Sequence, residues 1–291
     1  MNTTGPAIEA LDVARSFGGV RAVTAGNLTA HFGEVHGLVG ENGAGKSTLI
    51  KILGGVVKPD SGVVRFDGED VTHSVAAAAR THRVGMVFQE LTLFPWMTVA
   101  ENLFAESEPR GASRLIQRRK LVTLAEEVLE QHDVKGIDPR ALAGSLPLAQ
   151  RQIIEITGAF MRKPRILFLD EPTSALAEHE VAWLFGLVRK SRDAGAAILF
   201  TSHRWNEVSS LADRITILRN GEHVATRERF DEDEAVTLMT GRTIDRMYPD
   251  KPAPAADAEI VLEAQELRDD ILDGVSFQLR RGEILGVGGL A

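Results

Sequence analysis

The sequence of 291 residues contains no cysteine. It therefore has no disulfides and no thiolate metal sites, which fits a reducing compartment. Basic residues are not in excess either, since 33 Lys and Arg stand against 41 Asp and Glu, a formal net charge of -8. Neutralising a nucleic-acid backbone requires a surplus of cations, so this balance argues against a dedicated nucleic-acid binder, although it leaves room for a local basic groove.

Long apolar runs are also missing. No run of about 18 residues is apolar and free of charge, so we expect no helix that spans a bilayer. The N-terminal stretch MNTTGPAIEA has neither the basic leader nor the apolar core of a secretory signal. With 44% hydrophobic, 25% charged and 5% aromatic residues, the composition is that of an ordinary globular protein with one large domain or two smaller ones.

Short apolar stretches give the fold class. Five of them are apolar on both faces, as buried parallel strands are, over residues 34–39, 84–88, 165–169, 197–200 and 214–218. Helical patterns separate them, which predicts an α/β fold with a mainly parallel sheet covered by helices. From about residue 91 to 160 the pattern is only helical, with helices expected over 118–132 and 148–161. We interpret this region as a helical subdomain inserted into the core.

The chain is expected to hold a first domain over residues 1–245, a linker over 246–258 and the start of a second domain over 259–291. Residues 249–258, PDKPAPAADA, have the Pro- and Ala-rich composition of a linker. The stretch GEVHGLVG that begins at Gly33 is then echoed by GEILGVGG, which begins at Gly282. A repeat of such a long period indicates a duplicated domain and not a solenoid.

Residues 40–48, GENGAGKST, satisfy the phosphate-loop pattern G-x-x-x-x-G-K-[ST] in full. A predicted strand ends at Val39, and helix-prone residues follow from Thr48. Glycines allow successive backbone N–H groups to converge on an anion at the positive end of a helix. We expect Lys46 to reach the β- and γ-phosphates and Ser47 to ligate Mg²⁺. The predicted nucleotide-binding residues of the loop are Gly40, Glu41, Asn42, Gly43, Ala44, Gly45, Lys46, Ser47 and Thr48.

A pair of carboxylates follows the predicted strand 165–169. Asp170 is placed to orient the Mg²⁺ shell, and Glu171 can polarise an attacking water as general base, a contribution on the order of 10²–10⁴ in rate. The sequence has no Asn-Lys-x-Asp element of the kind that reads guanine, so ATP is favoured over GTP. Nothing in it resembles the arginine-rich lid of a P-loop kinase.

Read in order, these motifs resemble those of an ATP-binding cassette (ABC) ATPase over nearly the whole chain. The resemblance implies a P-loop NTPase fold, in which a RecA-like sheet carries an antiparallel portion. It also implies three further site residues by their position: Phe17 would stack on adenine, Gln89 would sense Mg²⁺ and the attacking water, and His203 would contact the γ-phosphate. Taken alone, Phe17 is more often a core residue, and His203 is more often a capping or core residue. The implied catalytic residues are Glu171, His203, Gln89 and Lys46, and the implied Mg²⁺ ligands are Ser47, Gln89 and Asp170.

Among ABC proteins, the motif sequences are most similar to those of bacterial carbohydrate importers of the ribose, galactose and xylose type, which carry two cassettes on one chain. The shared stretches are GENGAGKSTL, LFPWMTVAEN, EPTSAL and SHR. The resemblance implies membrane-spanning permease subunits, a periplasmic solute-binding protein and a second cassette as partners, and a peripheral place on the cytoplasmic face of the inner membrane. Phe94 and Trp96 would lie where a membrane subunit docks, with burial in the helical subdomain as an equal alternative.

The stretch SLPLAQRQ, residues 145–152, is where the chain departs from this family. By itself it predicts a helix capped by Ser145, with Leu148 on the apolar face. Aligned through Gln150, however, Pro147 replaces the serine and Ala149 the second glycine of the family's Leu-Ser-Val-Gly-Gln signature. Proline offers no hydroxyl and no N–H, and the Cβ of alanine crowds a phosphate. We expect that this signature does not support hydrolysis at the site it helps to form.

Ala177 is a second departure, because many family members have aspartate there.

Two further functions stay open at this point. One is a soluble ABC ATPase of translation or DNA repair, which the acidic balance disfavours. The other is a nucleotide-binding module that closes on ATP without turnover.

Overall fold

The computed structural model describes residues 5–105, 107–110, 115–242, 258–269 and 272–288. The chain divides into two compact units, residues 1–242 and 243–291, and each is described by itself. The predicted linker, apart from Ala258, lies outside the described residues.

A ten-stranded mixed sheet forms the frame of the first unit, in the order β5-β4-β1-β2-β10-β9-β3-β8-β7-β6. The last five strands of this order run parallel to one another. Their bounds are β9 Arg214–Arg219, β3 Val35–Val39, β8 Ala197–Thr201, β7 Ile166–Asp170 and β6 Val84–Val87. These are the five strands that the sequence predicts, so the α/β fold class is confirmed.

The antiparallel portion that the family resemblance implies is also present. It consists of β1 Pro6–Phe17, β2 Val20–His31, β4 Ser61–Phe66, β5 Glu69–Asp70 and β10 Glu222–Arg227. Strand β1 pairs with β2 and β4, and several register shifts interrupt both ladders. These bulges break the strict alternation of apolar and polar residues, which is why the sequence pattern alone does not predict β1 and β2.

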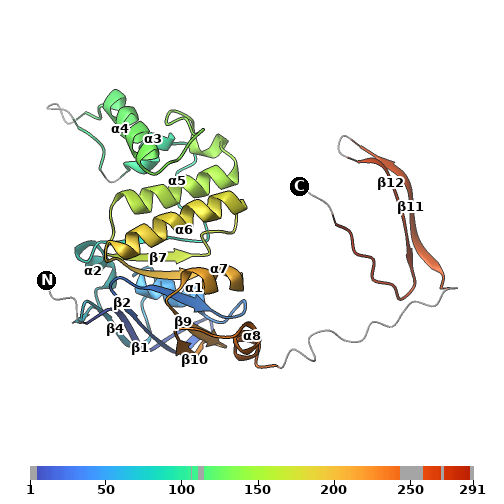
Figure 1. The fold of residues 1–291 in the computed structure, drawn as a ribbon, viewed down its shortest axis with the longest axis horizontal. Coiled ribbons are helices and arrows are strands. Elements are labelled where there is room, and N and C mark those ends of the chain that lie inside the picture. Colours follow the sequence, from blue (N-terminus) through green and yellow to red (C-terminus); the bar gives the residue numbers. More distant parts are fainter. Residues whose placement is uncertain (1–4, 106, 111–114, 243–257, 270–271, 289–291) are drawn as a thin grey trace. The chain divides into compact units, whose positions relative to one another are not determined.

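Helices cover both faces of the parallel strands (Figure 1). Their bounds are α1 Lys46–Leu53, α2 Val75–Thr81, α3 Val99–Leu103, α4 Arg118–Gln131, α5 Leu148–Met161, α6 Glu178–Asp193, α7 Trp205–Leu211 and α8 Glu232–Thr240. One apolar core joins α1 to β1, β4 and one face of the sheet, and the other joins α5, α6 and α7 to the opposite face. No helix among the described residues is long and apolar enough to cross a membrane.

Helices α3, α4 and α5 surround a third apolar core, which corresponds to the predicted helical region (Figure 1). The predicted helices 118–132 and 148–161 are α4 and α5. Two details of α5 were predicted wrongly. Ser145 does not cap it, because Ser145 belongs to a short 3-10 turn and its hydroxyl donates to the Leu142 carbonyl at 2.7 Å, while Pro147 is the N-cap. Leu148 lies in solvent, 53% exposed, instead of on the apolar face.

The second unit contains one hairpin of β11 Ile260–Arg268 and β12 Asp273–Arg280. Its irregularities repeat those of the β1–β2 hairpin. Asp12 in β1 has a left-handed φ of 48° and donates its N–H to Asn27 of β2 at 2.9 Å. Glu266 in β11 has a φ of 51° and donates its N–H to Ser276 of β12 at 2.9 Å.

The turns that follow the two hairpins match as well. Gly33 after β2 and Gly282 after β12 have φ values of 75° and 80°. The next residue, Glu34 in one case and Glu283 in the other, accepts a hydrogen bond from the backbone N–H three residues earlier, at 3.0 and 2.8 Å. The two segments therefore resemble each other in backbone geometry as well as in amino-acid sequence.

Candidate functional site

The phosphate loop joins the carboxyl end of β3 to α1, which begins at Lys46, two residues before the predicted start. A side chain at Gly40 would collide with the Leu218 carbonyl. At Gly45, where φ is 98°, a Cβ would lie 2.6 Å from the Ala22 carbonyl oxygen. These two positions therefore require glycine. The Gly221 N–H donates to the Ala44 carbonyl at 3.1 Å and fixes the loop from the other side.

Lys46 lies over the loop and is buried. Its ammonium donates to the carbonyls of Gly40 and Glu41 at 2.8 and 3.2 Å. Burial lowers the pKa of Lys46, and the nearby carboxylates Glu171 and Asp170 oppose this shift. The rest of the loop divides by exposure, since Glu41, Asn42 and Gly43 face solvent, Ala44 is buried and Ser47 and Thr48 are half-buried.

The three predicted Mg²⁺ ligands come together. Ser47, Gln89 and Asp170 line one cavity of about 350 Å³, and the Ser47 hydroxyl donates to Asp170 Oδ1 at 3.4 Å. In the described part of the chain, no group of three or more His, Cys, Asp or Glu side chains could hold a metal. One carboxylate, one hydroxyl and one amide nevertheless suit Mg²⁺, because this ion keeps several waters and takes its remaining ligands from phosphates.

Asp170 is buried at the end of β7. Burial raises the pKa of Asp170, while hydrogen bonds from Thr201 and Ser47 act in the opposite direction. The Thr201 hydroxyl donates to Asp170 Oδ1 at 2.8 Å and accepts the N–H of Glu171 at 2.9 Å. Sequence reasoning missed Thr201. The available signal was a hydroxyl residue directly after the predicted strand 197–200, at the same sheet edge as Asp170.

Glu171 and His203 face each other across the ends of β7 and β8. Glu171 Oε2 lies 3.6 Å from His203 Nδ1. The backbone of Glu171 has a left-handed φ of 49°, a conformation that is strained for a residue with a side chain. The His203 side chain is 54% exposed, so its alternative interpretation as a core histidine is wrong.

Phe17 ends β1 and is 45% exposed, which excludes the core alternative for this ring as well. The Arg15 guanidinium lies over the ring at 4.9 Å from its centroid. Phe17 pairs with Val20 at the tip of the β1–β2 hairpin, and Ala22 of the same hairpin borders the phosphate loop at Gly45. The hairpin that carries Phe17 thus borders the phosphate loop, and the exposed part of the ring can stack on a planar ligand.

The departures from the family pattern are visible at the starts of two helices. Pro147, with φ -53° and ψ 152°, is the N-cap of α5 and provides no side-chain hydrogen bond. Ala177 is the N-cap of α6, where Glu180 Oε2 accepts the Ala177 N–H at 2.7 Å. Neither helix start has the hydroxyl or carboxylate cap that the family pattern places there.

A family model described as "ABC transporter" matches residues 23–174, from β2 past the carboxylate pair. The chain belongs to the ABC transporter family. Its fold is that of an ABC-type ATPase cassette, as the resemblance in the motifs implied.

Curated relatives of this cassette are sugar import proteins. It is 42% identical to "Ribose import ATP-binding protein RbsA 1" of Mesorhizobium japonicum, over 100% of this chain and 57% of that protein. It is 39% identical to a "Putative ribose/galactose/methyl galactoside import ATP-binding protein" of Halalkalibacterium halodurans, over 97% of this chain and 54% of that protein. The chain thus spans a little over half the length of these relatives.

Solved ABC structures have the same fold. A nucleotide-free ATP-binding cassette from an ABC transporter superposes with a TM-score of 0.66 and 25% identity, over 81% of this chain and 95% of that one. A dimeric bacterial ABC transporter cassette superposes with a TM-score of 0.67 and 25% identity, over 77% and 100% of the two chains. The P-loop NTPase fold is therefore confirmed.

Proposed function

We propose that this cassette hydrolyses ATP to power the import of a sugar or sugar-like solute through membrane-spanning permease subunits. The observation that carries the proposal is the convergence of the phosphate loop, Asp170 and the Glu171–His203 pair at one edge of the sheet. The substrate class in this proposal is inferred from the relatives, which are named as ribose and galactose import proteins.

Each side chain has a role in this reaction. Lys46 and the loop N–H groups bind the β- and γ-phosphates, and Phe17 stacks on the adenine. Mg²⁺, held by Ser47 and Asp170 with Gln89 beside them, would neutralise phosphate charge when bound. Glu171 takes a proton from a water molecule while the oxygen of that water forms a bond to the γ-phosphorus. The bond from the γ-phosphorus to the bridging oxygen breaks, which releases ADP. His203 donates a hydrogen bond to the γ-phosphate.

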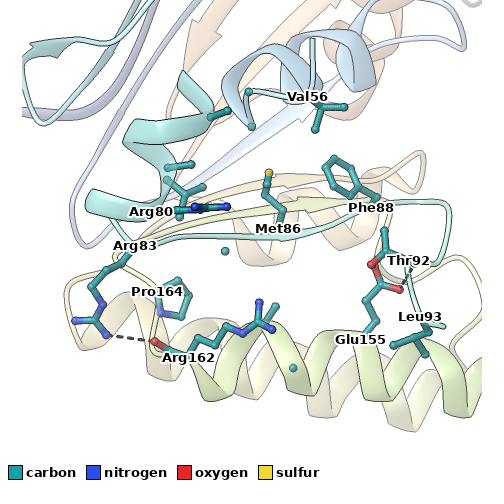
Figure 2. Close-up of a pocket in the computed structure, with 18 of the residues that line it drawn as sticks. Val56, Arg80, Arg83, Met86, Phe88, Thr92, Leu93, Glu155, Arg162 and Pro164 are labelled. Carbon is teal, nitrogen blue, oxygen red and sulfur yellow. Dashed lines mark hydrogen bonds between the residues drawn. The ribbon is translucent and has the colours of Figure 1, made fainter. Parts of the chain in front are cut away.

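A groove between the sheet core and the helical region is the proposed docking site for a permease subunit. It has a volume of about 700 Å³ and is lined on one side by Met86 and Phe88 and on the other by α5 (Figure 2). Two aromatic side chains close in sequence to the groove are accessible to a partner. Phe94 and Trp96 are 47% and 74% exposed, and their ring centroids lie 6.4 Å apart. This exposure contradicts the alternative that both aromatics belong to the core.

Residues 259–291 are proposed to begin a second cassette, which rests on the repeated hairpin geometry. The apolar side chains after this hairpin support it. Ile284 and Val287 are 91% and 87% exposed, whereas their counterparts in the first copy, Val35 and Leu38, are fully buried in β3. Such side chains need a sheet to pack into. The periplasmic solute-binding protein, which would act through the permease, and the peripheral position on the cytoplasmic face of the inner membrane belong to the same proposal.

The signature at Pro147 and Ala149 would serve the second cassette's site and not the one built on Lys46. We propose one hydrolytic and one degenerate site. Pro147→Ser with Ala149→Gly in the full-length chain restores the donors. A marked rise in ATP turnover at saturating substrate supports loss of function through the signature alone. Unchanged turnover contradicts loss through the signature alone and favours a second site that is silenced from both sides.

The main experiment measures ATP hydrolysis by the full-length chain assembled with its permease subunits in lipid vesicles. Lys46→Ala and Glu171→Gln should each lower turnover to less than about a tenth. Lys135→Ala is the matched control, since its side chain is 87% exposed and its ammonium pairs with Asp133, away from the phosphate loop. Retention of more than about a tenth of the rate in both site variants would overturn the assignment.

A further inference from the structure

We propose that Glu207 is a positioning residue of the hydrolytic site, which holds the loop that carries His203 against the loop that carries Glu171. The proposal rests on the ATPase function proposed above. Glu207 does not reach the phosphate-binding region itself and acts through hydroxyl groups on both loops.

One carboxylate oxygen makes the link. Glu207 lies in α7 and is only 8% exposed. Its Oε2 accepts the Thr173 hydroxyl at 2.7 Å and the Ser202 hydroxyl at 2.6 Å. Thr173 comes two residues after Glu171, and Ser202 directly precedes His203. The same oxygen therefore joins the loops after β7 and β8, which also approach each other at Glu171 and His203.

The bond to Ser202 also fixes the backbone around His203. The Ser202 hydroxyl oxygen accepts the N–H of Arg204 at 3.0 Å, which closes a turn with His203 as its middle residue. The second oxygen of Glu207 accepts the Arg204 guanidinium at 3.1 Å. That guanidinium is half exposed, so water screens the pair and it contributes little to stability.

This arrangement is more than an apolar core requires. A buried carboxylate is unfavourable unless its lone pairs are satisfied, and a leucine of similar size would pack without that penalty. Hydrogen bonds to a charged acceptor are short and directional, so they define the relative position of the two loops. The 3.6 Å separation of Glu171 and His203 depends on that position. A displacement of about 1 Å at a reacting group can lower a rate by about 100-fold.

The test uses the full-length chain with its permease subunits and measures kcat and KM for ATP. Glu207→Leu removes both bridges and should lower kcat by at least about tenfold, with KM within about twofold because the loop contacts to the phosphates lie elsewhere. Glu207→Gln keeps a carbonyl oxygen that can accept both hydroxyls, and kcat should stay within about threefold of wild type. Glu234→Leu is the control, because Glu234 is an exposed carboxylate of α8 that pairs with Arg227.

A double-mutant cycle separates positioning from a general packing role. If Glu207 acts through Ser202, then Ser202→Ala combined with Glu207→Leu should have no lower kcat than Glu207→Leu alone. Unchanged kcat in Glu207→Leu, or equal losses in the Gln and Leu variants, would overturn the proposal. Should Glu207→Leu bind no ATP because it does not fold, Ser202→Ala decides: a kcat lowered about tenfold supports the proposal and a wild-type kcat overturns it.

Failure of the ATPase proposal would look different. In that case the wild-type protein and Lys46→Ala would hydrolyse ATP at the same rate, whatever residue occupies position 207. The Glu207 variants are therefore interpreted only against a wild-type rate that depends on Lys46 and Glu171.

Discussion

Replacing Thr201 by valine is the most informative change in the site, because it removes one hydroxyl and keeps the shape. That hydroxyl donates to the Asp170 carboxylate at 2.8 Å and accepts the Glu171 N–H at 2.9 Å. Valine can do neither, and its methyl group occupies the same space. The change therefore affects the Mg²⁺ ligand and the general base together, without touching the phosphate loop.

The structure sets the size of the effect. Loss of the acceptor leaves the Glu171 N–H unpaired in a partly buried place, which is unfavourable by up to about 1–3 kcal/mol. Glu171 is held at a φ of 49°, a conformation worth about 1–3 kcal/mol of strain, which is then free to relax. A shift of the carboxylate by about 1 Å corresponds to a kcat about 10- to 100-fold lower. Loss of the donor also raises the pKa of Asp170 further, since the Thr201 hydrogen bond lowers it.

The assay is ATP turnover by the full-length chain with its permease subunits, titrated with Mg²⁺ at fixed ATP. Thr201→Val should show the lower kcat together with a higher half-saturating Mg²⁺ concentration, most clearly at acidic pH where a raised pKa leaves less ionised Asp170. Thr201→Ser keeps the hydroxyl and should behave as wild type. A Thr201→Val protein with wild-type kcat and wild-type Mg²⁺ dependence would refute the reasoning, and so would an equal loss in both variants.

Three further changes test other parts of the cassette. Burial raises the pKa of Glu155 above its usual 4.5 although Thr92 donates two hydrogen bonds to it (Figure 2). The native state thus binds the Glu155 proton more tightly than the unfolded state does, so the stability of the protein falls as pH rises from about 4.5 through the native pKa. Glu155→Gln should make the decrease of Tm over this pH range less steep. A Tm that decreases as steeply as in wild type would contradict this prediction. Phe17→Leu should raise KM for ATP about 2- to 10-fold at constant kcat, from about 0.5–1.5 kcal/mol of lost stacking, and an unchanged KM argues against stacking. Gly45→Ala should abolish ATP binding in a titration and lower Tm, because its Cβ would meet the Ala22 carbonyl at φ 98°; normal binding contradicts the loop geometry.

Strands and helices could be predicted from the sequence where apolar residues recur with a regular period along the chain. The five parallel strands and the helices α4 and α5 have apolar periodicity of their own, so their bounds agree with the structure to within one residue. The capping of α5 is different, although its first residue was predicted correctly. Ser145 is a good capping residue, but the 3-10 turn before Pro147 uses its hydroxyl, and that turn depends on contacts with residues 95–97 and not on local propensity.

The phosphate loop, the Asp170–Glu171 pair and the altered signature are written in contiguous residues, so the sequence by itself determined the kind of chemistry and the family. The tertiary structure decided which hydroxyl and carboxylate groups support that chemistry. Thr201 lies opposite Asp170 because the parallel register of β7 and β8 pairs them, and Glu207 reaches Thr173 from 34 residues away because α7 folds back over the same sheet edge. The physical reason is that strand register and helix packing bring distant residues within hydrogen-bonding distance, which no local pattern records.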